Sequence, residues 1–383
     1  MVYLKEGKNM KKILIVNDLL YGGGTENVLT ILTKTLKEAG HSITVLTYYH
    51  QEGYEKFQLE GVRYIHLGCP VPNFEANERV KLLAFKVRNL YSKFMFYYKN
   101  LFVKYDEVIA FKEGYMTQLT SRLRSPQKIA WVHTDFESFH WSKTSYKSED
   151  DEKKCYALYS TIVTVSMKSK EAFYKTIGYR DKVKMIYNPL DFETIISRAE
   201  KEAINLKKPL DKKLFITVGR LSEVKGYNQL LEIVNELNHY YEPYFELWII
   251  GDGEIKEILQ DYISANDLNN VKLLGHQDNP YPYLKQADYF ICSSKSESFG
   301  IAIVESMILN LPVISTKCGI VEEIITDETL GMILNDINSL STVMKEILEN
   351  KSIKIDHTKV MEKCYHNFSI ETFNEQVQKL VGE

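Results

Sequence analysis

The sequence predicts an α/β protein with two parallel β-sheets, each covered by helices. Short runs rich in β-branched and aromatic residues alternate along the chain with stretches of helical periodicity, which is typical of parallel sheets joined by helical crossovers. These runs fall into two series, and each series needs a sheet of its own. A length of 383 residues, 44% of them hydrophobic, suffices for two domains with separate cores.

The first series predicts strands at residues 12–16, 43–47, 108–111, 128–133, 161–165 and 183–187. The second series predicts strands at residues 214–219, 245–250, 271–274, 289–292 and 312–316. Helical periodicity is clearest at residues 25–39, 227–238, 254–265 and 301–309. A break is expected at Asn188-Pro189, because proline restricts the preceding residue and stops helix or strand continuation. The predicted domains are therefore residues 1–187 and 188–366.

The formal net charge of −3 conceals an asymmetry. Residues 1–190 carry 29 Lys and Arg against 20 Asp and Glu, whereas the remaining residues carry 19 against 31. We expect the basic N-terminal half to face something anionic. The protein as a whole is too acidic for a dedicated nucleic-acid binder, so no nucleic-acid partner is predicted.

The cysteines and the hydropathy pattern predict a cytoplasmic protein. The five cysteines are widely spaced and form no C-x-x-C pair, which argues against a zinc knuckle or a disulfide framework and suits a reducing compartment. No run of about 18 apolar residues occurs. The first apolar run, residues 13–16, is too short for a signal peptide.

A glycine-rich turn, YGGGTE at residues 21–26, joins the first predicted strand to the first predicted helix. Glycine lets the backbone approach a ligand closely, and a helix N-terminus offers free N–H groups to an anion. The nicotinamide-dinucleotide motif is not matched, because Asn27 replaces its third glycine and no acid ends the second strand. Taken alone, the motif also fits a plain tight turn.

Two cations, Arg220 and Lys225, follow the first predicted strand of the second series. Open α/β sheets bind ligands at the carboxyl ends of their strands. An arginine can fork two oxygens of a diphosphate while a lysine acts as a point charge. For either residue alone, a solvated surface cation is the alternative.

The most specific motif is ESFGIAIVE at residues 297–305, which follows a predicted strand and opens a predicted helix. Gly300 permits close backbone approach at the junction, and the new helix aims its N–H groups at the same place. Glu297 precedes the helix and Glu305 lies inside it, so the two acids need not share a target. A further candidate is His133, at the end of the strand predicted at 128–133, for which a hydrogen-bonded structural histidine is the alternative.

Together these residues resemble the retaining glycosyltransferases of family 4, of the bacterial surface-polysaccharide type. The family has the GT-B fold, with two facing Rossmann-like domains and an interdomain cleft that holds the active site. The matching positions follow the family's order along nearly the whole chain: Gly23-Gly24-Thr25-Glu26, His133, Asn188-Pro189, Gly219-Arg220, Lys225-Gly226, Gly251-Asp252-Gly253, the E-x7-E pair Glu297 and Glu305, and residues 312–316 with Glu323.

Two further expectations come from the resemblance. The last helix, at about residues 370–381 within the segment 367–383, should pack back on the N-terminal domain. Many members have a second glycine after Gly319, where this chain has Ile320, which predicts a bulkier loop on the donor side.

The resemblance also implies a role for each site residue. Arg220 and Lys225 would hold the donor diphosphate, and Glu297 would hydrogen-bond the donor sugar. Glu305 would bind the ribose hydroxyls, and His133 would contact the donor sugar near the reaction centre. The positions expected near the phosphates are Gly23, Gly24, Phe299, Gly300 and Ile301, with backbone N–H groups around Gly300 and Ile301 as donors. Gly23 and Gly24 would also pass close to the acceptor, because the N-terminal domain is the acceptor side.

The implied reaction is transfer of a hexose or N-acetylhexosamine, with retention, from a nucleotide sugar to a carbohydrate or lipid-linked acceptor. UDP-sugar is the expected donor because it is the family's commonest. No Asp-x-Asp occurs in the chain, and no divalent metal or other cofactor is expected. The alternatives are a sugar-nucleotide epimerase or a phosphorylase on the same fold, and a non-catalytic glycosyltransferase-like partner subunit. Such a subunit would be expected to lose at least one of the four charged site residues of the second domain.

The stretch 79–104 carries seven cations and no acid, interleaved with seven aromatic residues. Basic, aromatic amphipathic helices lie in the plane of a membrane interface. This pattern predicts that the protein docks peripherally on the anionic inner face of the cell membrane. The alternative is a helix that packs its aromatic residues on the first sheet and leaves a solvated basic edge.

Overall fold

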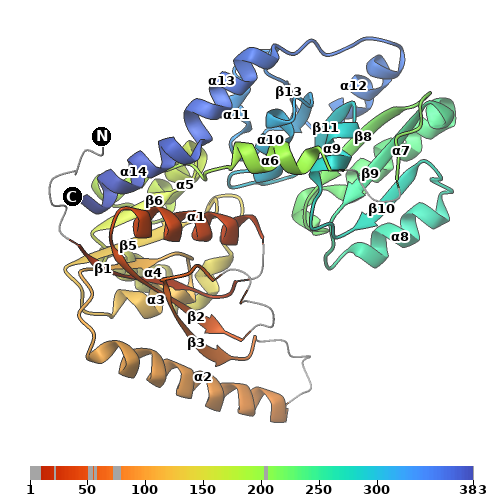
Figure 1. The fold of residues 1–383 in the computed structure, drawn as a ribbon. Helices are drawn as coiled ribbons and strands as arrows, with labels where there is room; N and C mark the ends of the chain where they lie inside the picture. The colour runs from red at the N-terminus through yellow and green to blue at the C-terminus, as the bar shows by residue number, and fades with distance from the viewer. Residues whose placement is uncertain are drawn as a thin grey trace, which may run out of the picture. The chain divides into compact units, whose positions relative to one another are not determined.

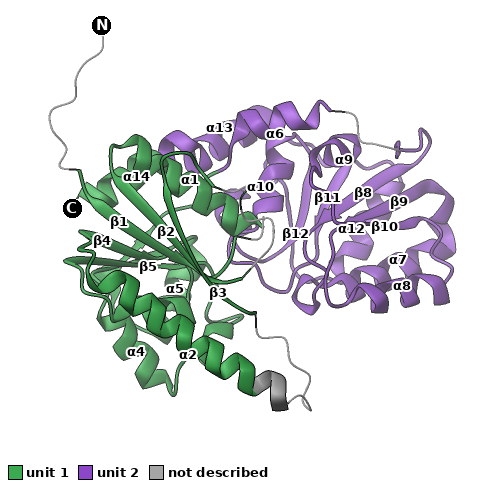
Figure 2. Cartoon of the chain, turned by 60° about the horizontal axis from the view of Figure 1, so that its bottom comes forward, with its two compact units in different colours: residues 1–189, 373–383 green, residues 190–372 purple. Residues whose placement is uncertain are grey.

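The computed structural model describes residues 10–20, 23–50, 55, 58–71, 79–201 and 206–382. The chain divides into two compact units, of which unit 1 is residues 1–189 with 373–383 and unit 2 is residues 190–372 (Figure 2). Each unit contains a wholly parallel sheet, which confirms the predicted α/β fold class. The division falls two residues after the predicted one. The chain returns to unit 1 at Phe373, six residues later than expected, because Ser369 still pairs with Leu190 whereas Phe373 contacts Trp131.

Unit 1 is built on a seven-stranded sheet with the order β3-β2-β1-β4-β5-β6-β7 (Figure 1). Its strands are β1 (Lys12–Asn17), β2 (Ser42–Tyr49), β3 (Arg63–Cys69), β4 (Glu107–Ala110), β5 (Gln127–Val132), β6 (Thr161–Thr164) and β7 (Val183–Met185). Its helices are α1 (Gly24–Glu38), α2 (Arg79–Leu101), α3 (Tyr115–Ser121), η2 (Trp141–Ser145), α4 (Glu149–Ala157), α5 (Met167–Thr176), η3 (Arg180–Lys182) and most of α14 (Ile370–Gly382).

Unit 2 is built on a six-stranded sheet with the order β10-β9-β8-β11-β12-β13. Its strands are β8 (Lys213–Val218), β9 (Phe245–Ile250), β10 (Val271–Gly275), β11 (Tyr289–Cys292), β12 (Val313–Thr316) and β13 (Met332–Leu334). Its helices are α6 (Phe192–Ala199), η4 (Glu223–Lys225), α7 (Tyr227–Tyr241), η5 (Glu242–Tyr244), α8 (Lys256–Ala265), α9 (Tyr281–Gln286), α10 (Ile301–Ile308), α11 (Val321–Ile324), α12 (Ser339–Leu348) and α13 (His357–Phe368).

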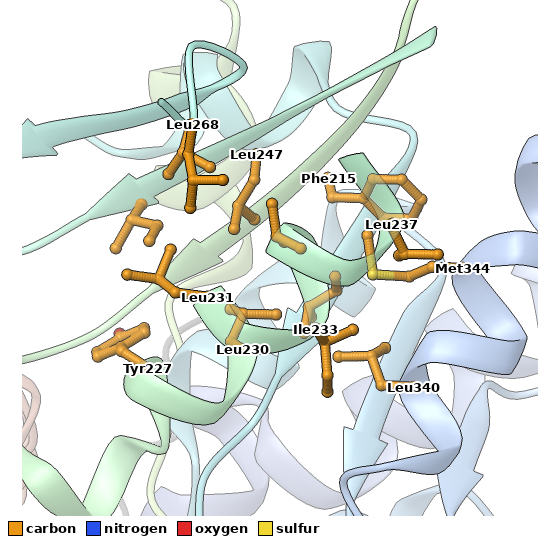
Figure 3. Close-up of a cluster of buried hydrophobic side chains, with 14 of the residues drawn as sticks. Phe215, Tyr227, Leu230, Leu231, Ile233, Leu237, Leu247, Leu268, Leu340 and Met344 are labelled. Atoms are coloured by element: carbon orange, nitrogen blue, oxygen red, sulfur yellow. The ribbon is translucent and has the colours of Figure 1, made fainter. Parts of the chain in front are cut away.

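The central strands are continuous apolar runs because helices cover both faces of each sheet. In β1, residues 13–16 have no exposed surface, and the same holds for residues 214–216 of β8. In unit 2, one face of the sheet packs on α7 through Leu230 and Leu237, and Leu340 and Met344 of α12 complete this cluster (Figure 3). Because the strands themselves are apolar, the polar side chains around each sheet lie on the loops that follow the strands.

The strand order reverses at the first strand of each sheet. In unit 1 the chain moves outward through β2 and β3 and then continues on the other side of β1 with β4. In unit 2 it moves through β9 and β10 and then continues on the other side of β8 with β11. Loops that leave β1 and β4, or β8 and β11, therefore diverge at their carboxyl ends, and such switch points are where open α/β sheets bind ligands.

Two of the four edge strands, β3 and β13, were not predicted from the sequence, whereas β7 and β10 were. Strand β3 mixes Arg63, His66 and Gly68 with apolar residues and is only partly buried, so it lacks the continuous apolar run of a central strand. Strand β13 has three residues, which is too short for a periodic signal.

A buried carboxyl group at the start of β4 makes the stability of unit 1 depend on pH. Glu107 has no exposed surface, and burial raises its pKa to about 7 although Lys11 Nζ lies 3.6 Å from Oε2. The folded state thus holds a proton that the unfolded chain releases near pH 4.5. This contribution to stability is complete below about pH 4.5 and is lost as the pH rises towards 7.

We predict that Glu107→Gln raises the free energy of unfolding at pH 8 by on the order of 3 kcal/mol, with little effect near pH 4.5, because glutamine mimics the protonated acid. Urea unfolding of both proteins between pH 4.5 and pH 8 measures the difference. A gain that does not depend on pH would contradict the assignment.

Candidate active site

In unit 2, the candidate residues gather at the carboxyl ends of β8 and β11, which flank the switch point. Arg220 and Lys225 lie on the loop after β8, and Glu297 lies on the loop after β11. The loop after β11 ends at Gly300, where α10 begins. The structure therefore brings together residues that are about 70 positions apart in the sequence.

The centre of this group is an ion pair between Lys225 and Glu297. Lys225 Nζ donates to Glu297 Oε1, which also accepts a hydrogen bond from Ser294 Oγ at 2.8 Å. The Lys225 side chain is 22% exposed and the Glu297 side chain is 15% exposed. Burial disfavours the charged ammonium of Lys225, but the adjacent carboxylate outweighs burial and raises its pKa. Lys225 therefore carries a full positive charge at neutral pH in a largely dehydrated position, where a charge acts strongly on a ligand.

Glycines allow the loops around this ion pair to approach more closely than other residues would. A Cβ on Gly226 would lie 2.2 Å from the carbonyl oxygen of Ser293, and one on Gly251 would lie 1.9 Å from that of Gly219. Both glycines also have a positive φ, 69° and 149°. The loops after β8, β9 and β11 are thus packed backbone to backbone, which fixes Lys225 relative to Glu297.

Arg220 lies on the same loop but behaves differently. Its side chain is 74% exposed, and its Nε donates to Glu254 Oε2 at 3.2 Å. Exposed ion pairs of this kind contribute little to stability. The guanidinium can therefore exchange Glu254 for an anionic ligand at small cost.

The predicted backbone positions lie where α10 begins. Gly300 has a φ of 91°, and a Cβ there would lie 2.7 Å from Cδ1 of Ile303. Phe299 is buried against Phe368, with ring centroids 5.4 Å apart, so only its backbone is available to a ligand. Ile301 is the first residue of α10 and is half-buried.

The loop after β12 completes the group. A Cβ on Gly319 would lie 2.8 Å from Cβ of Glu297, so this loop presses against the acid. The next residue, Ile320, is fully buried. The expectation that Ile320 makes the loop bulkier on the donor side is therefore wrong in this structure, because its side chain is accommodated in the interior.

Glu305, the second acid of the motif, has a separate environment on α10. Its Oε1 accepts a hydrogen bond of 2.8 Å from Tyr281 Oη, and the guanidinium of Arg198 lies 5.2 Å from the centre of the Tyr281 ring. Desolvation raises the pKa of Glu305, while the Tyr281 hydrogen bond and Arg198 oppose that shift. Sequence reasoning missed Tyr281 and Arg198, which no motif marks and which lie 24 and 107 positions before the acid.

In unit 1, a second set of polar residues lies at the switch point between β1 and β4. Lys112 Nζ pairs with Asp18 Oδ2 at 3.0 Å, and Glu26 Oε2 accepts a hydrogen bond of 3.1 Å from the backbone N–H of Gly23. Burial raises the pKa of Glu26, and the positive charge of Lys112 opposes this. Gly23 precedes Gly24, the first residue of α1, whereas Tyr21 and Gly22 of the predicted turn lie outside the described residues.

His133 follows β5, and its backbone and ring both form hydrogen bonds. The backbone N–H donates to Glu113 Oε2 at 3.1 Å, and Nε2 lies 2.9 Å from the carbonyl oxygen of Phe111. Since a carbonyl only accepts, Nε2 carries the proton and Nδ1 is left as the acceptor of a neutral ring. Burial lowers the pKa of His133 to about 4, although Glu113 opposes this. A structural role and a ligand-binding role for His133 are therefore compatible. Nε2 is bonded to the carbonyl oxygen of Phe111, while Nδ1 can accept a hydrogen bond from a ligand.

Asp18, Lys112 and Glu113 of this set were not singled out from the sequence. Each lies within two residues of the end of a predicted strand of the first sheet, and that position is the signal that would have found them. Within the described residues, no three His, Cys, Asp or Glu side chains are arranged to hold a metal ion. No helix in the described part of the chain is both long and apolar enough to cross a bilayer.

Family models match both halves of the chain. The model described as Glycosyltransferase Family 4 matches residues 22–194, and the model described as Glycosyl transferases group 1 matches residues 198–365. The matches and the fold support a glycosyltransferase of the GT-B class, with a family 4 domain followed by a group 1 domain.

Similar curated proteins match over part of their length. An uncharacterized glycosyltransferase of Methanocaldococcus jannaschii is 35% identical over 174 residues, which are 43% of this chain and 42% of that protein. The lipopolysaccharide core biosynthesis glycosyltransferase LpsE of Rhizobium meliloti is 27% identical over 183 residues, 46% of this chain and 51% of that protein. The chain thus spans about half the length of the curated relatives it matches.

Solved structures resemble the whole fold at low sequence identity. HepE of Anabaena, in complex with UDP and glucose, has a TM-score of 0.73 at 18% identity, covering 97% of this chain and 100% of that one. A sucrose-phosphate synthase of Thermosynechococcus elongatus has a TM-score of 0.74 at 15% identity, covering 97% and 98%.

We predict that His133 is neutral, with the proton on Nε2, throughout pH 6–8, because burial holds its pKa near 4. Nitrogen-15 NMR of the imidazole groups measures the tautomer and the midpoint, and a His133→Gln variant assigns the signal. A midpoint near 6.5, the ordinary value, would contradict the hydrogen-bond arrangement described above.

Proposed function

We propose that the protein transfers a hexose or an N-acetylhexosamine from a UDP-sugar, with retention of configuration, to a carbohydrate or lipid-linked acceptor in surface-polysaccharide synthesis. The observation that carries this proposal is the dehydrated Lys225–Glu297 ion pair at the switch point of unit 2, with Arg220 on the same loop. The group 1 match over residues 198–365 supports the donor assignment of this unit. The names of the relatives support the pathway, since LpsE acts in lipopolysaccharide core biosynthesis.

The chemistry requires positive charge beside the leaving group. When the sugar–phosphate bond breaks, the diphosphate gains negative charge and the sugar gains oxocarbenium character. A preorganised donor directed at such developing charge contributes about 3–4 kcal/mol to transition-state stabilisation. Lys225 suits this task because its neighbours already hold it in place and charged. Arg220, which is exposed, would donate two hydrogen bonds to oxygens of the same diphosphate.

In this proposal, Glu297 and Glu305 accept hydrogen bonds from hydroxyl groups of the donor. Glu297 keeps its second carboxylate oxygen for a sugar hydroxyl while Oε1 binds Lys225 and Ser294. Glu305 would accept from the ribose hydroxyls, with Tyr281 fixing the orientation of its carboxyl group.

In unit 1, we assign His133 to the donor sugar and the glycine turn to the acceptor side. The neutral ring of His133 has its Nε2–H committed to Phe111, so Nδ1 would accept a hydroxyl proton of the donor sugar. Because the ring stays neutral, it would bind without adding positive charge next to an oxocarbenium-like sugar. Gly23 and Gly24 would pass close to the acceptor.

We predict that transfer needs no divalent metal and depends on Lys225. With the donor that stabilises the protein most in a thermal-shift panel of UDP-, GDP- and ADP-sugars, excess EDTA should leave the rate unchanged. Lys225→Ala should lower kcat by about a hundredfold or more. The matched control is Lys295→Ala, which removes an exposed lysine from the loop after β11.

Activity that EDTA abolishes and Mg²⁺ or Mn²⁺ restores would overturn the charge assignment. Equal losses in the two lysine variants would show that neither loop tolerates the loss of a lysine, so that Lys225 has no special role. Thermal unfolding of Lys225→Ala without donor separates a loss of fold, expected if the unpaired Glu297 is costly, from a loss of chemistry.

A second prediction concerns the orientation of Glu305. Tyr281→Phe should raise the donor KM by about fivefold, since it removes one hydrogen bond worth about 1 kcal/mol to the acid. The loss should grow as the pH falls, because removal of the Tyr281 hydrogen bond raises the pKa of Glu305 further. Tyr283→Phe, on the same helix but bonded to Gln277, is the control. An effect of Tyr281→Phe on kcat alone would place Glu305 away from the donor.

A further inference from the structure

Helix α2 of unit 1 exposes a row of large apolar side chains. Six of them share one side of the helix: Leu83, Val87, Leu90, Phe94, Tyr98 and Leu101. At 100° per residue they fall within an arc of about 80°. Their exposed fractions are high, for example 70% for Leu90, 60% for Phe94 and 68% for Leu101. The rings of Phe94 and Tyr98 stack at 5.8 Å, so the row is continuous along the helix.

The opposite side of α2 attaches the helix to the sheet. Phe96 has no exposed surface and belongs to the core cluster of β1, β2 and β4, and Phe85 and Tyr97 pack against that cluster. The neighbouring buried positions are polar: Ser92 is 1% exposed and Asn100 is 8% exposed. The helix thus buries a mixed face and leaves its more apolar face outside, the reverse of an ordinary surface helix. Figure 1 shows α2 along the edge of unit 1, beside β3.

Cations line one side of the apolar row. By helical geometry, Lys86 and Lys93 lie beside the arc, whereas Arg88 and Lys99 lie towards the buried face. There Arg88 Nη2 donates to the carbonyl oxygen of Gly68 at 3.3 Å. No acidic residue occurs between positions 79 and 104. The side chains of Arg79 and Lys81, which belong to the predicted stretch, lie outside the described residues.

We propose that this face of α2 docks on an anionic phospholipid bilayer. An apolar arc with a row of cations beside it, and no acidic residue between positions 79 and 104, matches an interface in which acyl chains lie below anionic headgroups. A second copy of the chain is a poor occupant, because pairing two such faces would bring like charges together. The aromatic residues of the stretch divide between the two interpretations of the sequence. Phe85, Phe96 and Tyr97 pack on the unit, whereas Tyr91, Phe94, Tyr98 and Phe102 do not. The inference does not rest on the proposed transferase function.

The test is co-sedimentation of the full chain with vesicles. We expect binding to vesicles of phosphatidylcholine with about a third phosphatidylglycerol, little binding to phosphatidylcholine alone, and release as salt is raised. Leu90→Ser with Phe94→Ser and Leu101→Ser should abolish binding and leave thermal unfolding unchanged, since all three side chains are exposed. Lys86→Gln with Lys93→Gln should weaken binding by about 25-fold, about fivefold for each cation near the surface.

Two further proteins serve as a control for charge and as a probe of insertion into the bilayer. Lys143→Gln with Lys147→Gln removes two exposed lysines of unit 1 outside α2 and should bind like the parent. Phe94→Trp should show blue-shifted emission on anionic vesicles, which distinguishes apolar insertion from charge attraction alone.

Three outcomes would overturn the proposal. The first is no binding to anionic vesicles at low salt. The second is binding that the serine variant retains. The third is a dimer in solution that the serine variant dissociates, without vesicle binding by the parent, which would make a second copy the occupant.

Discussion

The close backbone contact between the loops after β8, β9 and β11 is the constraint on which the candidate site depends. Gly226 and Gly251 lie against carbonyl oxygens at distances that exclude any side chain. Because the loops cannot separate without breaking this packing, Lys225 and Glu297 are held together even though burying two charges is expensive. The ion pair is therefore maintained by the surrounding backbone, and its charges are positioned before any ligand arrives.

Much of the fold could be predicted because parallel strands covered on both faces must be apolar throughout. The strands at the centre of each sheet carry that pattern, and their predicted bounds differ from the observed ones by at most two residues. Strand β3 escaped prediction because it is only partly buried, and β13 because it has three residues. The other two edge strands, β7 and β10, were predicted, so a position at the edge of a sheet does not by itself hide a strand.

The candidate site was predictable to a lesser degree. Lys225, Glu297 and Gly300 could be chosen because each follows a strand and has chemistry suited to a diphosphate or a sugar. The partner of Glu305 could not, since Tyr281 reaches it from another helix. Glu113 follows a predicted strand and could have been chosen, but its hydrogen bond to His133 could not be inferred. The same limit applies to protonation. That His133 is neutral follows from burial and from the carbonyl of Phe111, neither of which can be inferred from a lone histidine in a sequence.

The path of the chain between the two units also determines which unit is completed first during synthesis. Unit 2 is one continuous segment, residues 190–372, whereas unit 1 takes its last residues from the far side of that segment. Phe373 contacts Trp131, and Asn374 accepts a hydrogen bond from Thr35, so α14 contributes to the interior of a unit whose preceding residues end at position 189. On the ribosome, every residue of unit 2 is joined before this helix of unit 1 is made. Unit 1 therefore stays incomplete, without the Phe373 contact to Trp131, while all of unit 2 is synthesised.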